Sequence, residues 1–423
     1  MTPRARSALM WLLAAVTLGI AILLIDVLPE RLRGPSEEAL VAVPPPPPGA
    51  ALVPVPGGAV GVLPVAAADR KRITDRALSD AVTLANRTDS QALLIWRDGA
   101  LQLEHYGRGA RPSDRLASAD LHASLLGLLI GPAVKQGVLR SADQPLAELL
   151  PQWATDPRGR ITVRQLVEGT SGLAAPAGGG DPLQATLAAP PGARRAPSAI
   201  EALVLGRVLE VAAKETYAEL LSDWLWQPIG ARDAAVTREG SGLFRTDCCL
   251  EASARDWLRV GILLLERGRM GSENVVPADW IAALTTPAAD NPNAGLRVLL
   301  AWPHRQDPEV GFRATEAFVL PDTLFLAGAG GQRLYVSRSA NLVIVRLGAA
   351  RADWDDSVLP NLVARGLIDP PPPAVTPHVP KGGPTEMPPI TPPPAVPKVQ
   401  AVPLAAPEPA PSAPPAGSGR SRP

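Results

Sequence analysis

The chain has 423 residues, and its 41 lysines and arginines balance its 41 aspartates and glutamates to a formal net charge of +0. This balance argues against a nucleic-acid partner, because phosphate binding needs a clustered excess of positive charge. The 49 prolines and 37 glycines are too many for one compact fold of this length. They concentrate in residues 44–64 and 370–423, which leaves a central stretch long enough for a sizeable core.

Residues 8–25 form an unbroken apolar run that follows Arg4 and Arg6. In a helix, a run of this length crosses most of the hydrocarbon core of a bilayer. No small-residue cleavage site follows, so residues 1–33 are expected to be a cytoplasmic stub and a transmembrane anchor; a removed signal peptide is the alternative. The arginines favour a cytoplasmic amino terminus. This predicts a single-pass protein of the cell membrane whose globular part lies on the periplasmic side.

Two proline-rich segments flank the centre of the chain. Proline fixes φ and donates no backbone hydrogen bond, so residues 34–68 are expected to be a semi-rigid polyproline linker. Residues 370–423 contain almost no aromatic side chains and cannot bury enough apolar surface to offset their ordering entropy. They are expected to be a disordered tail. One globular domain, residues 69–369, is expected between the two segments.

Within the domain, apolar residues at helical spacing predict five helices, at 69–87, 121–138, 199–213, 217–226 and 254–266. Pro132 is expected to kink the second of these. Strands are predicted at 91–96 and 100–106, joined by Asp98-Gly99, a strong hairpin signal, and at 332–337 and 341–347. Because strand pairs stand near both ends of the domain, we expect one sheet built from distant segments.

Cys248 and Cys249 are the only cysteines and are adjacent. A disulfide between neighbours needs a strained ring, so both are expected to be buried, small apolar side chains. No Cys/His cluster has metal-ligand spacing, and the chain has neither a phosphate-binding glycine loop nor a dinucleotide fingerprint. The sequence therefore predicts no metal and no cofactor.

Several runs, in order along residues 69–369, resemble the serine β-lactamase-related hydrolases, which include class C β-lactamases, penicillin-binding proteins and 6-aminohexanoate-dimer hydrolases. The runs are the hairpin 92–106, the early helical region at 128–131, 137–139, 149–151 and 170–173, the middle at 246–250, 254–257 and 276–280, and the strand 330–336. The resemblance implies an α+β fold of the β-lactamase/DD-peptidase type, in which an antiparallel sheet is flanked by helices and joined to a helical subdomain.

The chemistry of that family needs Ser-x-x-Lys at the start of a buried helix, Tyr-x-Asn on a loop, and Lys-Thr-Gly or His-x-Gly at a strand edge. In the first motif the helix brings the amine over the hydroxyl, so that lysine can take its proton. In this sequence Asp120 replaces the serine, Ala123 the lysine and Pro197 the tyrosine, and the third motif falls on residues 329–331, from Ala329 to Gly331. No lysine follows a serine by three residues, and no tyrosine precedes x-Asn. The resemblance therefore implies a degenerate, inactive relative.

Three neighbouring side chains are weak candidates for a rewired site. His122 follows Asp120 by two positions, and residues two apart on a helix do not face each other, so a structural histidine is the simpler interpretation. Ser118 and Ser124 flank the site as possible nucleophiles. Asp120 itself would form an anhydride with a carbonyl substrate, with no lysine to manage protons.

Three hypotheses follow. In the first, a membrane-anchored envelope protein keeps the hydrolase fold as a binding or scaffolding module for a peptidoglycan-like peptide or a protein partner, and its proline-rich tail can reach a second partner. In the second, the protein is an active serine hydrolase (an esterase, amidase or β-lactamase-like enzyme) with a rewired site. In the third, the domain is a spacer whose cleft is filled by its own side chains.

Overall fold

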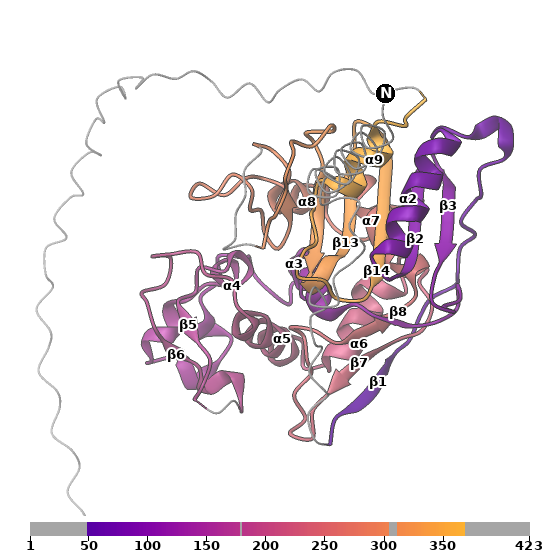
Figure 1. Cartoon of the computed structure of the whole chain (residues 1–423). Coiled ribbons are helices and arrows are strands. Elements are labelled where there is room, and N and C mark those ends of the chain that lie inside the picture. The colour runs from indigo at the N-terminus through magenta and orange to yellow at the C-terminus, as the bar shows by residue number, and fades with distance from the viewer. Residues whose placement is uncertain (1–48, 178–179, 304–310, 369–423) are drawn as a thin grey trace, which may run out of the picture. The chain divides into compact units, whose positions relative to one another are not determined.

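A computed structural model describes residues 49–177, 180–303 and 311–368 (Figure 1). The predicted anchor at residues 8–25, the start of the predicted linker and the predicted tail at 370–423 lie outside these residues. Within the described ranges, no helix has both the length and the apolar character needed to cross a membrane.

Helices and strands are interspersed along the chain, and the longest helices lie in its first two thirds. The α-helices are α2 (Asp75–Arg87), α3 (Ala123–Lys135), α4 (Val163–Glu168), α5 (Ala199–Ala213), α6 (Tyr217–Leu221), α7 (Ala254–Leu265), α8 (Ala278–Leu284) and α9 (Val358–Ala364). The strands are β1 (Ala51–Val55), β2 (Ser90–Arg97), β3 (Ala100–Tyr106), β4 (Leu116–Ala117), β5 (Leu173–Ala174), β6 (Thr186–Leu187), β7 (Ala234–Arg238), β8 (Leu250–Ala252), β9 (Arg269–Met270), β10 (Glu273–Asn274), β11 (Leu299–Leu300), β12 (Leu324–Gly328), β13 (Gln332–Ser337) and β14 (Leu342–Gly348).

The largest sheet is antiparallel, with the strand order β11-β12-β13-β14-β2-β3. Its centre joins the two ends of the domain, because β14 pairs with β2 and places Ile344 opposite Ile95. The prediction of one sheet built from distant segments is confirmed. A second sheet has the order β1-β7-β8-β4.

The hairpin β2–β3 forms where the sequence predicts it. Asp98 has φ 49° and Gly99 has φ 79°, so both residues of the turn adopt the left-handed conformation. A two-residue turn of this type matches the right-handed twist of the strands it joins, and Asp-Gly is among the few pairs that adopt it at low cost. The turn therefore fixes the register of the first two strands.

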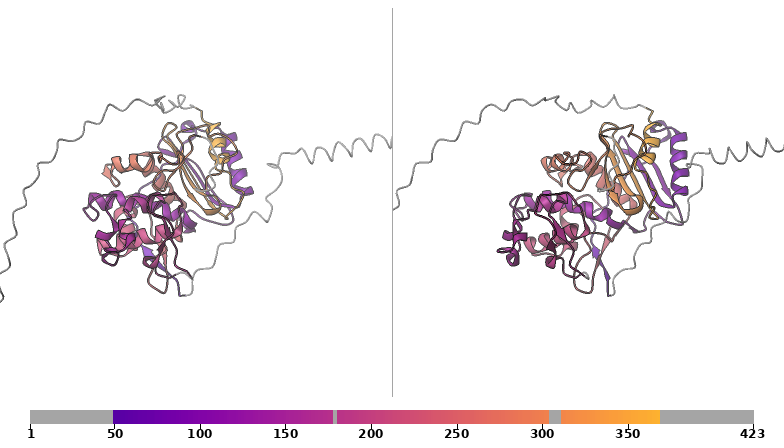
Figure 2. Two further views of the ribbon diagram at one scale, coloured as in Figure 1. Left: turned by 90° about the vertical axis from the view of Figure 1, so that its left-hand side faces the viewer. Right: turned by 60° about the vertical axis from the view of Figure 1, so that its left-hand side comes forward.

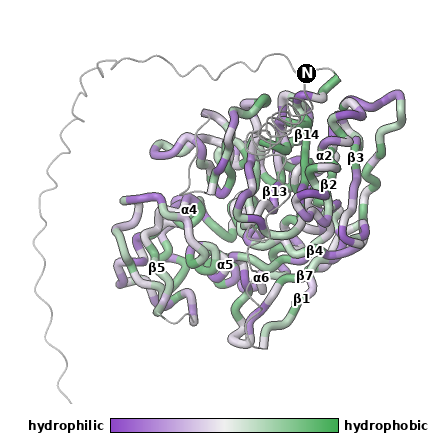
Figure 3. Tube along the Cα trace, in the orientation of Figure 1, coloured by the Kyte–Doolittle hydropathy of each residue, from purple (hydrophilic) through white to green (hydrophobic). Residues whose placement is uncertain are grey.

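The large sheet is covered on both faces, which explains its nearly continuous apolar strands. Leu93 and Ile95 of β2 belong to a cluster with α2 and α9, whereas Leu94 and Trp96 face the larger core that includes α7. The alternation follows from the two-residue period of a strand. Figure 2 shows α2 on one side of the sheet and the helical region on the other, and Figure 3 colours β14 largely hydrophobic.

All five predicted helices are present, with boundaries that differ from the prediction by a few residues. α5 spans the predicted residues 199–213, and α7 ends one residue before the prediction. The first helix begins only at Asp75, because the Thr74 side chain accepts a hydrogen bond from the N–H of Ala77 and caps it there. The predicted helix at 217–226 is α6 followed by a π-helical turn, η9 (Ser222–Trp226).

The later part of the predicted linker differs from the expectation. Strand β1 pairs with β7, and further along Leu101 donates its N–H to Pro64 O while Ala66 donates to Leu101 O. Pro54 is accommodated because β1 is the outermost strand of its sheet, where a missing N–H leaves no ladder bond unmade. Residues 51–66 are thus paired with the domain rather than forming a free spacer.

Candidate functional site

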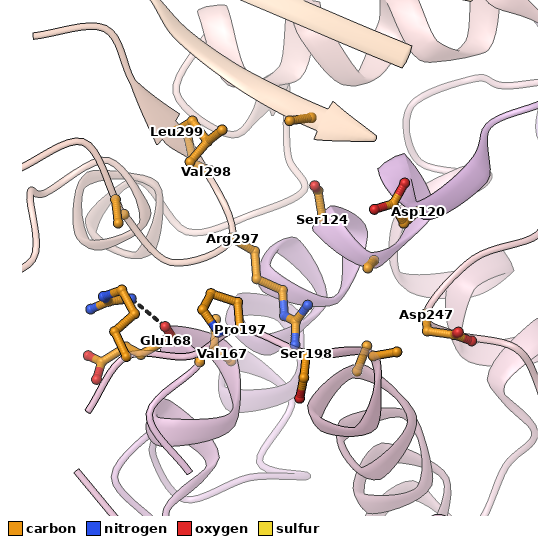
Figure 4. Close-up of a pocket in the computed structure, with 18 of the residues that line it drawn as sticks. Asp120, Ser124, Val167, Glu168, Pro197, Ser198, Asp247, Arg297, Val298 and Leu299 are labelled. Atoms are coloured by element: carbon orange, nitrogen blue, oxygen red, sulfur yellow. Dashed lines mark hydrogen bonds between the residues drawn. The ribbon is translucent and has the colours of Figure 1, made fainter. Parts of the chain in front are cut away.

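A cavity of about 320 Å³ lies where the end of β12 meets the first turn of α3 (Figure 4). Its wall is built from six separate stretches of chain, which explains why no single run in the sequence identifies it. They are the start of α3 with the residues before it, the end of α4, the segment entering α5, the loop before β8, the loop before β11, and β12. All three degenerate motifs have at least one residue in this wall or touching it.

Asp120 and Ala123 of the first motif both line the cavity. They lie at the junction between a short 3-10 helix, η4 (Ala119–His122), and α3. The exposed carboxylate of Asp120 accepts a hydrogen bond from the backbone N–H of Ala329. This close approach depends on Gly328, since a Cβ there would lie 2.6 Å from the backbone nitrogen of Leu121. The position expected to carry a nucleophile is therefore tied to the sheet edge by a carboxylate.

Pro197 of the second motif also lines the cavity, just before α5. It packs on Gly169, where a Cβ would come within 2.9 Å of the Pro197 Cα. The tyrosines are engaged elsewhere. Tyr106 donates to Glu104, and Tyr335 accepts a hydrogen bond from the indole of Trp354. No tyrosine of the described residues lines the cavity.

The two end residues of the third motif lie in different surroundings. Ala329 contacts Asp120, whereas Gly331 has φ 86° and packs on Trp354, outside the cavity wall. The strand-edge residue that lines the cavity is Ala327, two positions before the predicted motif. Its side chain carries neither a charge nor a hydrogen-bonding group. Gly328 follows directly and is required by its close contact with Leu121, which the sequence alone does not reveal.

No lysine of the described residues lines the cavity either. Lys71 pairs with Asp75 at 2.6 Å, and Lys135 donates to the carbonyl oxygen of Asn274. Lys214 caps the far end of α5 in a left-handed conformation. A shift in the alignment of the first motif therefore brings no amine into the cavity.

His122 is completely buried and does not line the cavity. Its Nδ1 lies 2.6 Å from Cys248 O, which can only accept, so Nδ1 carries the proton. Its Nε2 then accepts from the hydroxyl of Tyr217 at 2.8 Å. Burial lowers the pKa of His122 to about 4. The ring is neutral and both of its nitrogens are hydrogen-bonded, which indicates a structural histidine.

The two candidate serines differ. Ser118 is fully buried and donates to Leu250 O at 2.7 Å, away from the cavity wall. Ser124 lines the cavity four residues after Asp120, and no hydrogen bond to its hydroxyl is found among the described residues. Of the candidate nucleophiles, Ser124 is the hydroxyl that faces the cavity.

The cysteines depart from the prediction. Cys248 and Cys249 form a disulfide, and Cys248 lines the cavity. In the turn that joins them, Cys249 has φ 70°. Contacts with other segments fix this turn, since Cys248 O accepts from His122 and Cys249 O accepts from the N–H of Thr237. The expectation of two buried thiols was wrong because it considered the dipeptide alone and not the contacts that fix this turn.

Sequence reasoning missed the arginines of the site. Arg297, in the loop before β11, projects into the cavity toward Pro197 and Ser198 (Figure 4). Arg195 also lines the wall, where it pairs with Asp290 at 3.0 Å. Neither arginine lies in a recognisable motif, so no pattern in the sequence singles them out. The described residues contain no group of three His, Cys, Asp or Glu side chains that could hold a metal.

Comparisons with known proteins agree with this fold. A 6-aminohexanoate-dimer hydrolase of Paenarthrobacter ureafaciens is 25% identical over 235 residues, which cover 49% of this chain and 60% of that protein. The chain thus matches less than two thirds of that relative's length. A penicillin-binding protein homologue from Caulobacter crescentus has a TM-score of 0.56 at 14% identity, covering 69% of this chain and 96% of its own. A class C β-lactamase from Rhodobacter sphaeroides has a TM-score of 0.53 at 18% identity, covering 69% and 99%.

The family model named Beta-lactamase matches residues 75–364, which span α2 to α9. The match therefore covers the large sheet, its flanking helices and the whole cavity wall. The chain belongs to the Beta-lactamase family of serine-hydrolase-related proteins.

Proposed function

We propose that this protein is a non-catalytic member of its family that uses the cavity to bind a ligand rather than to turn it over. The observation that carries the proposal is the carboxylate of Asp120, bonded to the N–H of Ala329 at the position where a nucleophilic serine is expected. Ala123 and Pro197 stand where the amine and the phenol are expected, and the described cavity wall has neither lysine nor tyrosine.

The chemistry follows from these substitutions. A serine hydroxyl is a weak nucleophile until a neighbouring base takes its proton. His122 cannot be that base, because both of its ring nitrogens are engaged and burial holds its pKa near 4. The remaining route, attack by the Asp120 carboxylate, gives an anhydride that no group in the described wall is placed to resolve.

An open cavity supports a ligand-binding role over that of a simple spacer. A spacer predicts that side chains fill the cleft, yet a volume of about 320 Å³ remains between β12 and α3. That volume lies in the range of small-molecule sites, which are concave, mostly apolar and carry a few placed polar groups. A peptidoglycan-like peptide or a peptide segment of a partner protein is a ligand of suitable chemistry.

We further propose that the domain works in the bacterial envelope, held to the membrane by residues 8–25. Composition supports this: the apolar run is long enough for a bilayer, and the proline-rich residues after it are suited to hold a domain away from a surface. Protease treatment of spheroplasts tests it. Digestion of the domain from outside is expected, and a domain protected until lysis would contradict the proposal.

The absence of catalysis is tested by exposing the purified full-length protein to a fluorescent fluorophosphonate and a fluorescent penicillin, followed by intact-mass measurement. No adduct is expected, while an active class C β-lactamase in parallel confirms that the reagents react. A stoichiometric adduct on this protein would overturn the proposal. A cooperative thermal transition of the same sample establishes that the protein tested is folded.

An active hydrolase with a rewired site is the second candidate, and Ser124 is the observation that favours it. Its hydroxyl faces the cavity and lies about one helical turn from Asp120. If an adduct forms, peptide mapping identifies its residue, and Ser124→Ala should abolish it. Ser118→Ala is the matched control, because the Ser118 hydroxyl is committed to Leu250 O and lies outside the wall.

A further inference from the structure

The backbone conformation and packing around Arg297 fix the position of this residue. It lies between α8 and β11 with φ 59°, in the left-handed region that a non-glycine residue adopts only when its surroundings require it. The N–H of Leu296 donates to Leu284 O, and the chain packs tightly on α3 at Gly127, where a Cβ would lie 3.0 Å from Leu296 O and 3.5 Å from the Arg297 Cβ. The fold thus directs this arginine into the cavity.

The guanidinium has few partners for a half-buried cation. Its Nη2 donates to Leu166 O at 3.2 Å, while its Nε is buried with no acceptor. No carboxylate among the described residues hydrogen-bonds to it. Glu201, a carboxylate that attracts Arg297 electrostatically, already accepts from the hydroxyl and N–H of Ser171 and from the N–H of Ser198. Buried donors without acceptors are rare in folded proteins and call for an explanation.

Of the two arginines that line the described cavity wall, only Arg297 lacks an ion pair with a carboxylate. Arg195 pairs with Asp290, and Asp247 pairs with Arg245 at 2.8 Å. Arg297 therefore provides a cation with unused donors in a wall that also contains Ala123 and Pro197, whose side chains are small or cyclic. In Figure 4 its side chain crosses this space toward Ser198.

We propose that Arg297 is the anion anchor of the cavity and that the ligand is a monoanionic carboxylate with an N–H donor and an apolar body, such as the carboxyl end of a short peptide. This rests on the proposed binding function. A guanidinium presents planar donors that match a carboxylate. Val167, Val298 and Leu299 supply apolar wall.

The remaining charges of the wall select among anions. Asp120 and Glu168 also line the cavity, so a doubly charged phosphate meets repulsion that a single carboxylate meets less. Asp120 is exposed, and only one of its oxygens is bonded to Ala329, so the other can accept from an N–H of the ligand. Opposite charges in one cavity therefore fit a ligand with a carboxylate at one end and a donor at the other.

The test measures binding to the full-length protein by calorimetry. The probes are N-acetyl-dialanine in its L,L and D,D forms, the corresponding C-terminal amides, and inorganic phosphate. At least one acid is expected to bind about 10-fold or more tightly than its amide, because the amide loses the charge-assisted hydrogen bonds. Arg297→Gln should weaken the acid by about 10- to 100-fold without affecting the amide.

Two variants keep the test decisive. Arg164→Gln removes an arginine that does not line the cavity and is paired with Asp143 at 2.6 Å, and it should change the affinity by less than about 3-fold. Arg297→Lys keeps the charge without the planar fork and should fall between wild type and Arg297→Gln. A cooperative melt is required of each variant.

Three outcomes would overturn the assignment: equal binding of acid and amide, tighter binding of phosphate than of either acid, or no binding of any acid at millimolar concentration. Retained affinity in a folded Arg297→Gln variant would do the same. The proposed function fails on different evidence, namely a covalent adduct or turnover of the probe. A non-catalytic protein with another class of ligand thus remains distinguishable from a catalyst.

Discussion

The carboxylate of Asp120 accepts a hydrogen bond from the backbone N–H of Ala329, and this contact joins the first turn of α3 to the end of β12. Two elements some two hundred residues apart in the chain thus meet at the position where the family's nucleophile is expected. The carboxylate takes up a backbone donor that lies two residues after Ala327, the residue of β12 that lines the cavity. A ligand carbonyl seeking the same donor would have to displace it.

Restoring the first motif should restore reactivity in two steps. Asp120→Ser alone supplies a hydroxyl without a base, and it should form the fluorophosphonate adduct only slowly. The double change Asp120→Ser with Ala123→Lys places an amine one helical turn away, and general-base assistance should raise the rate of adduct formation by about 100-fold or more. Intact-mass time courses measure this, with Ala123→Lys alone as the control. A single Asp120→Ser variant that reacts as fast as the double variant would contradict the expectation.

The buried imidazole of His122 should make stability depend on pH. Its pKa is about 4 in the folded protein because of burial, against 6.5 for the ordinary side chain. Between these values the unfolded chain binds a proton that the folded chain does not, so the unfolding free energy falls as pH decreases from about 6.5 to 4. The contribution of neutral His122 to the unfolding free energy is fully present above pH 6.5. By about pH 4 roughly 3 kcal/mol of that contribution is lost.

Denaturant titrations of wild type and His122→Gln at several pH values test this linkage. The variant cannot titrate at this position, so its unfolding free energy should change less across the same interval even if its stability is lower throughout. Asp247 and the Tyr217 hydroxyl are present in both proteins and therefore do not produce the difference. Parallel pH profiles for the two proteins would show that His122 does not carry the effect.

The disulfide between Cys248 and Cys249 should contribute little to global stability. It closes the smallest possible loop, so the entropy it removes from the unfolded chain corresponds to about 1 kcal/mol. The double variant Cys248→Ser with Cys249→Ser should therefore fold and lose about that much. Native protein should resist alkylation until it is treated with a dithiol, after which both cysteines should react. Alkylation of either cysteine in the untreated protein would argue against the bond.

Gly328 should tolerate no side chain. A methyl group there would lie 2.6 Å from the nitrogen and 2.8 Å from the Cβ of Leu121, which forces β12 away from α3. Gly328→Ala is expected to lower the unfolding free energy by about 1–3 kcal/mol. Gly61→Ala is the matched control, since nothing lies within 4 Å of a Cβ at that position, and it should change stability by less than about 0.5 kcal/mol. Equal effects of the two changes in denaturant unfolding would refute the close contact.

The sequence by itself determined the local elements and the loss of the catalytic residues. Asp98-Gly99 predicts its hairpin because a two-residue turn of this type needs both residues at positive φ. Apolar residues at helical spacing mark α5 and α7, which bury most of their circumference and leave only a narrow stripe exposed. The missing lysine and tyrosine could be read directly from the motifs, since short-range spacing carries that chemistry.

Only the tertiary structure decided what occupies the cavity. Arg297 stands in no motif and reaches the wall because a left-handed residue packs against Gly127 of a distant helix. The disulfide between Cys248 and Cys249 lies in a turn that hydrogen bonds from His122 and Thr237 hold in place. Strand β1 belongs to the domain because its backbone pairs with β7. Each of these depends on contacts between segments far apart in the chain, which local propensity and spacing do not encode.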